Sequence, residues 1–332
     1  MDELNSDNHT DAGYSTDFLN TSTKLDFLNF IEQEDLDDFF INDKQSKYFD
    51  EDNYISECTK SENEIKILSM NIQSLNSKFS SLKCFLSNFP NKKSLPDILC
   101  LQEIWHIPVP EIFAMEGYKF FYKQRNRQGG GIGFYIKDFL SVDILHEESI
   151  FIESIFESLV IKIGFQGKSL VICNFYKPNN FTVVKKSKLE ETFSENFDKM
   201  LKSLSKTNMP IILTGDANLD LFQICKDNHV FNYVQSYTSE GFINIVNKAT
   251  RTFKEQFSLI DHVCINFSPP NLKTGILIDA LSDHFHPFIN FSFFVNHEIE
   301  SEYVQKRLFQ DISYSQFNRS LANYDWESVY VY

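Results

Sequence analysis

Short apolar runs that end in polar residues recur along the chain, and each predicts a buried strand. In the clearest case, residues 211–214 lie between Pro210 and Gly215 and are followed by Asp216 and Asn218. A brief apolar run between Pro and Gly favours a sheet interior over a helix. We expect Gly215 to turn the backbone sharply, so that Asp216 and Asn218 project from the sheet edge into solvent.

Five other apolar runs have the same form, at residues 65–70, 97–101, 170–175, 258–260 and 276–281. The polar residues that follow them include Asn71, Glu103, Tyr176, Asp261, Asp283 and His284. A single polar residue after a strand is most often only its solvated end. The ordered set instead predicts that oxygen and imidazole groups gather at one edge of the sheets.

Helical spacing of apolar residues occurs at 77–89, at 189–204 and, over a shorter stretch, at 228–237. Ser187 with Glu190 resembles a capping box at the start of the second helix. Paired strands are expected at 118–137 and again at 156–175. Since strands outnumber helices and include hairpins, we predict an α/β protein with mixed sheets covered by helices.

Three basic residues, Lys123, Arg125 and Arg127, precede the triple glycine Gly129 to Gly131. No Lys-Ser/Thr pair follows, and the next predicted element is a strand, so this segment is not a nucleotide-binding loop. Two interpretations stay equally open. The segment is either a flexible hairpin turn or a basic loop whose glycines let the backbone approach a phosphodiester.

Acidic residues are concentrated at the N-terminus. The first 60 residues hold 16 of the 46 acidic residues but only 4 of the 31 basic ones, and therefore most of the net charge of -15. We predict that residues 1–62 form a mostly disordered tail, with a transient helix at 25–41. Such a tail could bind a protein partner or mimic nucleic acid, although a merely solvating tail is the simpler interpretation.

The six cysteines are scattered, without a CxxC pair, which indicates reduced core residues. The N-terminus lacks the basic and apolar regions of a signal peptide, and no stretch has the length and apolarity of a membrane span. We expect a soluble intracellular protein that does not bind membranes.

The candidate ligands are hard oxygen donors, which suit Mg²⁺ or Mn²⁺ better than zinc. They comprise Asn71, Glu103, Asp216, Asn218, Asp261 and Asp283. Phosphodiester hydrolysis needs a deprotonated water and groups that shield developing negative charge, and this set offers both. Of the nearby His284 and His286, we expect one to be catalytic and the other structural.

These motifs resemble the endonuclease/exonuclease/phosphatase superfamily, and most of all the apurinic-endonuclease-type domain of non-LTR (LINE-type) retrotransposons. The similar segments, which span about residues 65 to 295, are 70–75, 101–105, 129–131, 174–178, 215–218, 250–251, 258–261 and 282–284. The resemblance implies a four-layer α/β sandwich at residues 63–297, with two mixed sheets face to face. It also implies a Mg²⁺-dependent enzyme that nicks DNA, and hence a nuclear location.

The resemblance further implies a role for each site residue. Glu103, Asn71 and Asp283 would bind the metal ion, with Mg²⁺ expected and Mn²⁺ as a substitute. Asp216 would prepare the attacking water, and Asn218 and Tyr176 would contact the scissile phosphate. His284, oriented by Asp261, would stabilise charge on that phosphate, and Thr250 and Arg251 would touch DNA.

The sequence departs from the family in two places. Gln73 stands where relatives that cleave abasic sites carry an acid, which resembles the retrotransposon branch. The spacing from His284 to Pro287 is one residue longer than usual. Residues 298–332 resemble a truncated linker that leads to a reverse transcriptase. A phosphatase or phospholipase of the same superfamily, and a catalytically silent interaction module, are the alternative interpretations.

Overall fold

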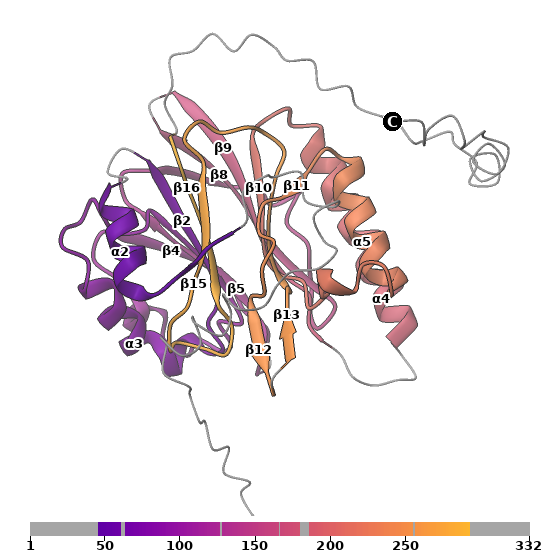
Figure 1. The fold of residues 1–332 in the computed structure, drawn as a ribbon, viewed down its shortest axis with the longest axis horizontal. Coiled ribbons are helices and arrows are strands. Elements are labelled where there is room, and N and C mark those ends of the chain that lie inside the picture. The colour runs from indigo at the N-terminus through magenta and orange to yellow at the C-terminus, as the bar shows by residue number, and fades with distance from the viewer. Residues whose placement is uncertain are drawn as a thin grey trace, which may run out of the picture.

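The computed structural model describes residues 46–60, 64–126, 128–165, 167–179, 186–254 and 256–292. Within these ranges, two mixed β-sheets pack face to face and helices cover their outer faces (Figure 1). The predicted α/β sandwich with four layers is confirmed. The expected helix at 25–41 and the predicted linker at 298–332 lie outside the described residues.

The first sheet has seven strands, in which β1 pairs with β15 and β2 with β3 in parallel and the other pairs are antiparallel. In spatial order these are β1 (Tyr48–Phe49), β15 (Lys273–Leu277), β16 (His286–Phe291), β2 (Ile65–Asn71), β3 (Ile98–Gln102), β5 (Ile132–Lys137) and β4 (Tyr118–Lys123).

The second sheet contains one parallel pair, β9 with β10, among antiparallel ones. Its spatial order is β11 (Ile243–Asn244), β14 (Asp261–Ile265), β10 (Ile211–Asp216), β9 (Lys168–Tyr176), β8 (Phe156–Phe165) and β6 (Ser141–Ile144), with β7 (Phe151–Ile152) also on β8. A separate hairpin is formed by β12 (Arg251–Phe253) and β13 (Gln256–Ser258).

Helices α2 (Glu51–Lys60) and α3 (Leu75–Ser87) pack outside the first sheet, and α4 (Lys186–Ser205) and α5 (Asn228–Ser239) outside the second (Figure 1). Two 3₁₀ turns, η1 (Pro110–Phe113) and η3 (Leu221–Gln223), lie in connections. Each sheet is therefore buried on both faces, which is why all seven residues of β2 are buried and its sequence is an apolar run.

The helix predictions differ from the structure only at their ends. Helix α3 begins at Leu75 because Ser74 accepts a hydrogen bond from the Ser77 backbone nitrogen at 3.3 Å. The predicted capping box is wrong, since α4 already includes Ser187. Glu190 instead accepts a hydrogen bond from Lys177 Nζ at 3.0 Å.

The predicted tail is wrong for residues 46–60, which belong to the folded domain. Strand β1 extends the first sheet, and α2 buries Tyr54 and Cys58 completely. The ring centres of Tyr54 and Phe288 lie 4.9 Å apart. Asp52 of this helix is exposed and Glu51 and Glu57 are partly exposed, so charge alone concealed a segment with a small apolar face.

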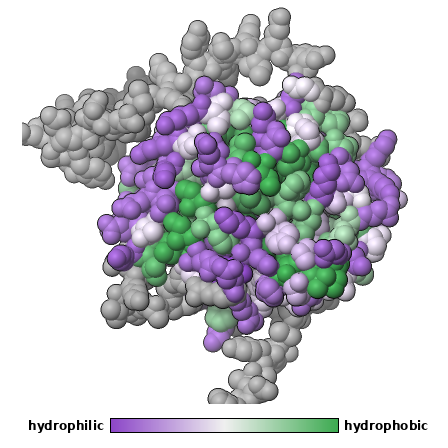
Figure 2. Space-filling model, turned by 180° about the vertical axis from the view of Figure 1, so that it is seen from behind, coloured by the Kyte–Doolittle hydropathy of each residue, from purple (hydrophilic) through white to green (hydrophobic). Residues whose placement is uncertain are grey.

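On the face shown in Figure 2, hydrophobic groups form separate patches between hydrophilic side chains. None of the described helices is long and apolar enough to cross a membrane. All six cysteines are free, and Cys58, Cys100, Cys173 and Cys264 are buried, as predicted, whereas Cys84 and Cys225 are exposed and do not belong to the core.

Candidate active site

Strand β10 brings three predicted site residues to one edge of the second sheet. Asp216 is its last residue and lies opposite Tyr176 of β9 on one side and Asp261 of β14 on the other. Gly215 is needed inside the strand, because a Cβ there would stand 1.8 Å from the Phe175 carbonyl oxygen. The expected turn at Gly215 is therefore wrong, and Asp216 is fully buried rather than in solvent.

Asp261 begins strand β14 instead of ending a strand, contrary to the sequence prediction. It still reaches the predicted edge because β14 runs antiparallel to β10, so the start of one strand meets the end of the other. Thr250 fixes this start, since its Oγ1 accepts hydrogen bonds from the backbone nitrogens of Ile260 at 3.1 Å and Asp261 at 2.9 Å.

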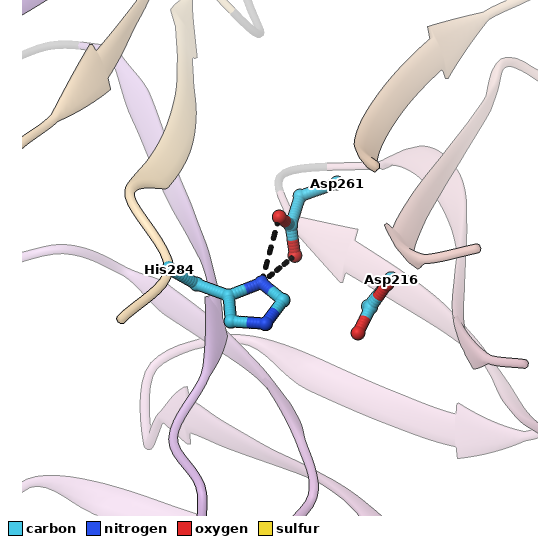
Figure 3. A group of neighbouring side chains, drawn as sticks. All are labelled: Asp216, Asp261 and His284. Carbon is cyan, nitrogen blue, oxygen red and sulfur yellow. Dashed lines mark hydrogen bonds and ion pairs between the residues drawn. The ribbon is translucent and has the colours of Figure 1, made fainter. Parts of the chain in front are cut away.

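Asp261 and His284 form a buried pair. The imidazole Nδ1 lies 2.8 and 3.0 Å from the two carboxylate oxygens, with Asp216 beside them (Figure 3). Burial alone would lower the pKa of His284, but the carboxylates of Asp261, Asp216 and Asp283 raise it to about 9. The imidazole is therefore held as a cation at neutral pH, with its orientation set by Asp261.

Asp216 is the least favourably placed carboxylate of the cluster. Burial, and then repulsion from Asp261, raise its pKa to about 7, while His284 opposes this shift. Asn218 lowers the pKa through its backbone nitrogen, which donates to Asp216 at 2.8 Å. A carboxylate with a pKa near neutrality is suited to take a proton from water.

Glu103 lies at the facing edge of the first sheet, directly after β3. Tyr176 Oη donates to its Oε1 at 2.9 Å, and Trp105 Nε1 donates to its Oε2 at 3.1 Å. Asn71 Nδ2 links the two sheets by donating to Glu103 at 3.0 Å and to Asp216 at 2.9 Å. Asn71 thus presents its nitrogen to these carboxylates, so a role as metal ligand requires its amide to turn over.

Asp283 is the most exposed carboxylate of the group, with 33% of its side chain accessible. Its Oδ2 accepts hydrogen bonds from Arg251 Nε at 3.0 Å and Nη2 at 2.8 Å, and its Oδ1 accepts one from Gln73. Burial raises its pKa, but His284 and Arg251 outweigh this effect and lower the pKa below its usual value.

The structure does not support DNA contact for two of the predicted residues. Arg125 is only 8% exposed and pairs with the buried Glu157, because that carboxylate needs a positive partner. Thr250 is fully buried and holds Asp261. Lys123 is exposed, with its Nζ 4.8 Å from the centre of the Phe151 ring, and Arg127 lies outside the described residues.

His286 is the structural histidine of the pair. It is fully buried in β16, and its Nε2 lies 3.2 Å from Asp279 Oδ1. Sequence reasoning missed three residues that support the site: Trp105, Gln102 and the amide of Asn174. Gln102 and Asn174 join the two sheets directly below Glu103 and Tyr176 through a buried 2.6 Å hydrogen bond. All three residues lie in segments 101–105 and 174–178, which resemble the superfamily, but the motifs do not indicate that these side chains bond Glu103 or each other.

The residues present fit a divalent metal ion. Asp216, Asp261 and His284 place potential ligand atoms within 4.8 Å of one another, and Glu103 shares the Asn71 amide with Asp216. Burial raises the pKa of Asp216 most, and repulsion from Asp261 and Glu103 adds to this effect, so a cation at this place would relieve both. Oxygen donors with unbalanced negative charge favour a hard cation such as Mg²⁺ or Mn²⁺.

No family model matches the sequence, and no curated protein matches it significantly. Solved structures do match. An endonuclease/exonuclease/phosphatase family protein from Bacteroides thetaiotaomicron superposes with a TM-score of 0.51 at 16% identity, over 70% of this chain and 98% of its own. The chain has the endonuclease/exonuclease/phosphatase fold.

Two other proteins with this fold differ in their biological setting. The endonuclease domain of TRAS1, a telomere-specific non-LTR retrotransposon, matches with a TM-score of 0.50 at 14% identity, over 69% of this chain and 98% of its own. The human Nocturnin catalytic domain matches with a TM-score of 0.51 at 15% identity, over 70% and 94%. At such identities the endonuclease/exonuclease/phosphatase fold is shared, while the substrate is not decided by it.

Proposed function

We propose that the chain is a Mg²⁺-dependent DNA endonuclease that hydrolyses phosphodiester bonds and derives from a non-LTR retrotransposon. The observation that carries this proposal is the buried Asp261–His284 pair beside Asp216. The positively charged imidazole of His284 thus lies beside the carboxylate of Asp216, whose pKa is about 7. Hydrolysis of a phosphodiester needs both a group that stabilises negative charge and a group that accepts a proton.

In this proposal each side chain has one task. Asp216 accepts the proton of the attacking water, and the His284 imidazolium, oriented by Asp261, stabilises charge on the phosphate. Asn218 and Tyr176, which both lie beside Asp216, contact that phosphate. These groups lie along one edge of the sheets. Their arrangement supports a reaction in which the attacking water and the phosphate bind at this edge, between the two sheets.

Glu103 and Asp283, together with Asn71, are the residues proposed to hold Mg²⁺, with Mn²⁺ as a substitute. When bound, the ion lowers the pKa of water and offsets negative charge that develops on the phosphate. The three-residue cluster with His284 is a weaker ligand set, because Asp261 already occupies the imidazole Nδ1 and Mg²⁺ prefers oxygen. Glu103 and Asp283 are also more accessible than Asp216 and Asp261.

DNA as the substrate is supported by the likeness to TRAS1, a telomere-specific non-LTR retrotransposon whose endonuclease domain has the same fold. Lys123 and Arg251 are the described basic residues that we propose to contact the DNA backbone. Arg251 is part of the site itself, since it pairs with Asp283. A nuclear location follows from a DNA substrate and is part of the same proposal.

The test is nicking of supercoiled plasmid by purified protein, with Mg²⁺, with EDTA and with Mg²⁺ restored. We expect open-circular product only with the metal ion, and loss of this product in His284→Asn. The same preparations should be assayed on an inositol phosphate and on a phospholipid. Activity on these substrates without plasmid nicking would assign the site to the phosphatase or phospholipase alternative, and no activity on any substrate would favour the silent module.

A further inference from the structure

The glycine turn at Gly129 to Gly131 is built around a buried ion pair that has no part in the proposed catalytic roles. Arg125 donates to Oε1 of Glu157, which is fully buried, and the Gly131 backbone nitrogen donates to Oε2 at 2.7 Å. A Cβ on Gly130 would stand 2.2 Å from the Arg125 guanidinium carbon. Glycine is therefore required because the guanidinium lies directly against the backbone.

The carbonyl groups of this turn hold the two residues that follow Glu103. The backbone nitrogen of Trp105 donates to Gly130 at 2.8 Å, and that of Ile104 donates to Gly131 at 3.3 Å. Glu103 and Trp105 have positive φ angles of 52° and 59°. Non-glycine residues keep such strained conformations only where the surrounding structure imposes them. The turn imposes them here together with Ser74 and Leu75, whose backbone nitrogens donate to the carbonyl oxygens of Glu103 at 2.8 Å and Ile104 at 3.1 Å.

The Glu103 carboxylate is oriented from two sides by groups that border the same ion pair. Tyr176 holds Oε1, and its ring centre lies 5.9 Å from the Arg125 guanidinium, within the range of a cation–π contact. Trp105 holds Oε2, and its backbone is attached to the turn. Arg125 Nη2 has no hydrogen-bond partner among the described residues. The guanidinium is therefore held by its ion pair with Glu157 and by its contact with the Tyr176 ring.

We infer that Arg125 and Glu157 are positioning residues, which act through the glycine turn and Tyr176 to hold the Glu103 carboxylate in its metal-binding orientation. This inference rests on the proposed function, because it requires Glu103 to be a metal ligand. Residues that orient a ligand typically change metal affinity by about 10- to 100-fold when they are replaced. Lysine cannot substitute for Arg125, since it lacks the planar fork that both bonds Glu157 and lies flat on Gly130.

Trp105 offers a readout that does not depend on catalysis. The chain has two tryptophans, Trp105 and Trp326. In a Trp326→Phe protein, the remaining indole is hydrogen-bonded to Glu103, so bound Mn²⁺ should quench its fluorescence. Titration with Mn²⁺ alone, without DNA, then gives the metal affinity. We expect Arg125→Lys and Glu157→Gln to weaken this affinity about 10- to 100-fold, and Glu103→Gln to weaken it at least as much.

Nicking should change in a matching way. The Mn²⁺ concentration for half-maximal nicking should rise in Arg125→Lys, while the rate at saturating Mn²⁺ stays within a few-fold of the parent protein. A merely structural role would instead lower the rate at every metal concentration, in proportion to the unfolded fraction.

The matched control is Lys137→Met, which breaks another buried ion pair of the same domain. Lys137 Nζ lies 2.7 Å from Asp97, at the opposite end of β3 from Glu103. This variant should lose stability but keep its Mn²⁺ affinity. All affinities are compared at equal folded fraction, which urea unfolding measures. If Glu157→Gln does not fold, Arg125→Lys alone tests the inference.

Equal Mn²⁺ affinity in Arg125→Lys, Lys137→Met and the parent protein would overturn the inference and leave the pair with a purely structural role. A folded parent protein that binds no Mn²⁺ at all would overturn the proposed function as well. These two failures are distinguishable, because the first appears only in the variants and the second already in the parent.

Discussion

Asp216 is the residue at which the proposed chemistry and the stability of the fold oppose each other. It has no exposed surface, and Asp261 and Glu103 add repulsion to the cost of burial. Its pKa of about 7 in the folded protein lies above its ordinary value of 3.8. A buried carboxylate that is destabilised in this way is expected where the residue is kept for function.

Replacement of Asp216 with Asn should therefore separate stability from activity. The raised pKa means that the folded state binds the Asp216 proton more tightly than the unfolded state, so stability falls as pH rises from about 4 through 7. Without metal at pH 8, Asp216→Asn should be more stable than the parent by about 1–3 kcal/mol. Nicking should fall about 10²- to 10⁴-fold. Urea unfolding at pH 5 and pH 8, with plasmid nicking on the same preparation, measures both.

The control for this substitution is Asp138→Asn, the same chemical change at an exposed position beyond the far end of β5. It should alter neither nicking nor the pH dependence of stability. An Asp216→Asn protein that nicks at the parent rate would remove Asp216 from the catalytic assignment. If Asp216→Asn were instead less stable than the parent at pH 8, the role of Asp216 would be structural, at the end of its strand.

Among the elements, β1 and α2 show how a small apolar face can outweigh an acidic composition. Tyr54 and Cys58, four residues apart, lie on the same side of α2 and are fully buried. Tyr48 of β1 donates to the Ala249 carbonyl at 3.0 Å, directly before Thr250. These two elements thus connect the edge of the first sheet to the segment that holds Asp261.

Tyr54→Ala should lower the free energy of unfolding by about 3–5 kcal/mol, the usual cost of removing a buried aromatic side chain. Ser56→Ala, on the exposed side of the same helix, should change it by less than about 0.5 kcal/mol. Urea unfolding of both variants measures the difference. Equal stabilities would mean that α2 does not pack on the sheet in solution and that the predicted tail does extend to residue 62.

At the scale of the whole molecule, charge is distributed unevenly about the site. The described domain begins at Ser46, whose backbone nitrogen donates to Asn247 Oδ1 at 2.8 Å, and Lys248 Nζ lies 5.2 Å from the Tyr48 ring centre. The acidic N-terminal segment therefore joins the domain close to Lys248 and Arg251. We expect the negative charge of this segment to oppose DNA binding at that surface.

Removal of residues 1–45 should strengthen DNA binding at low salt, and the gain should disappear at high salt. Screening shortens electrostatic interactions from about 10 Å at 0.1 M salt to about 3 Å at 1 M. Fluorescence anisotropy with a labelled DNA duplex, at several salt concentrations, compares residues 46–332 with the full chain. As a control for length, the full chain with Glu34, Asp35, Asp37 and Asp38 changed to amides should bind DNA with intermediate affinity. Equal affinities at every salt concentration would exclude an effect of this segment on DNA binding and assign it a solvating role only.

The sequence alone predicted the longer buried strands, three of the four described α-helices and the set of polar residues at the site. Apolar runs bounded by Gly or Pro report burial on both faces directly, because a strand between a helix layer and a second sheet has no polar side. The ordered motifs identified Asn71, Glu103, Asp216, Asp261 and His284, and the structure brings them together. Their assignment to individual catalytic steps stays a prediction.

Only the tertiary structure decided which of these groups are buried and which basic residues face solvent. The sequence predicts DNA contacts for Arg125 and Thr250. In the folded protein, Arg125 instead bonds Glu157 and Thr250 bonds the backbone of Asp261. Strand direction decided the place of Asp261, since an antiparallel neighbour brings the start of β14 to the end of β10. Partners from 11 to 32 residues apart set these two side-chain orientations, and a local pattern of apolar and polar positions carries no record of such contacts.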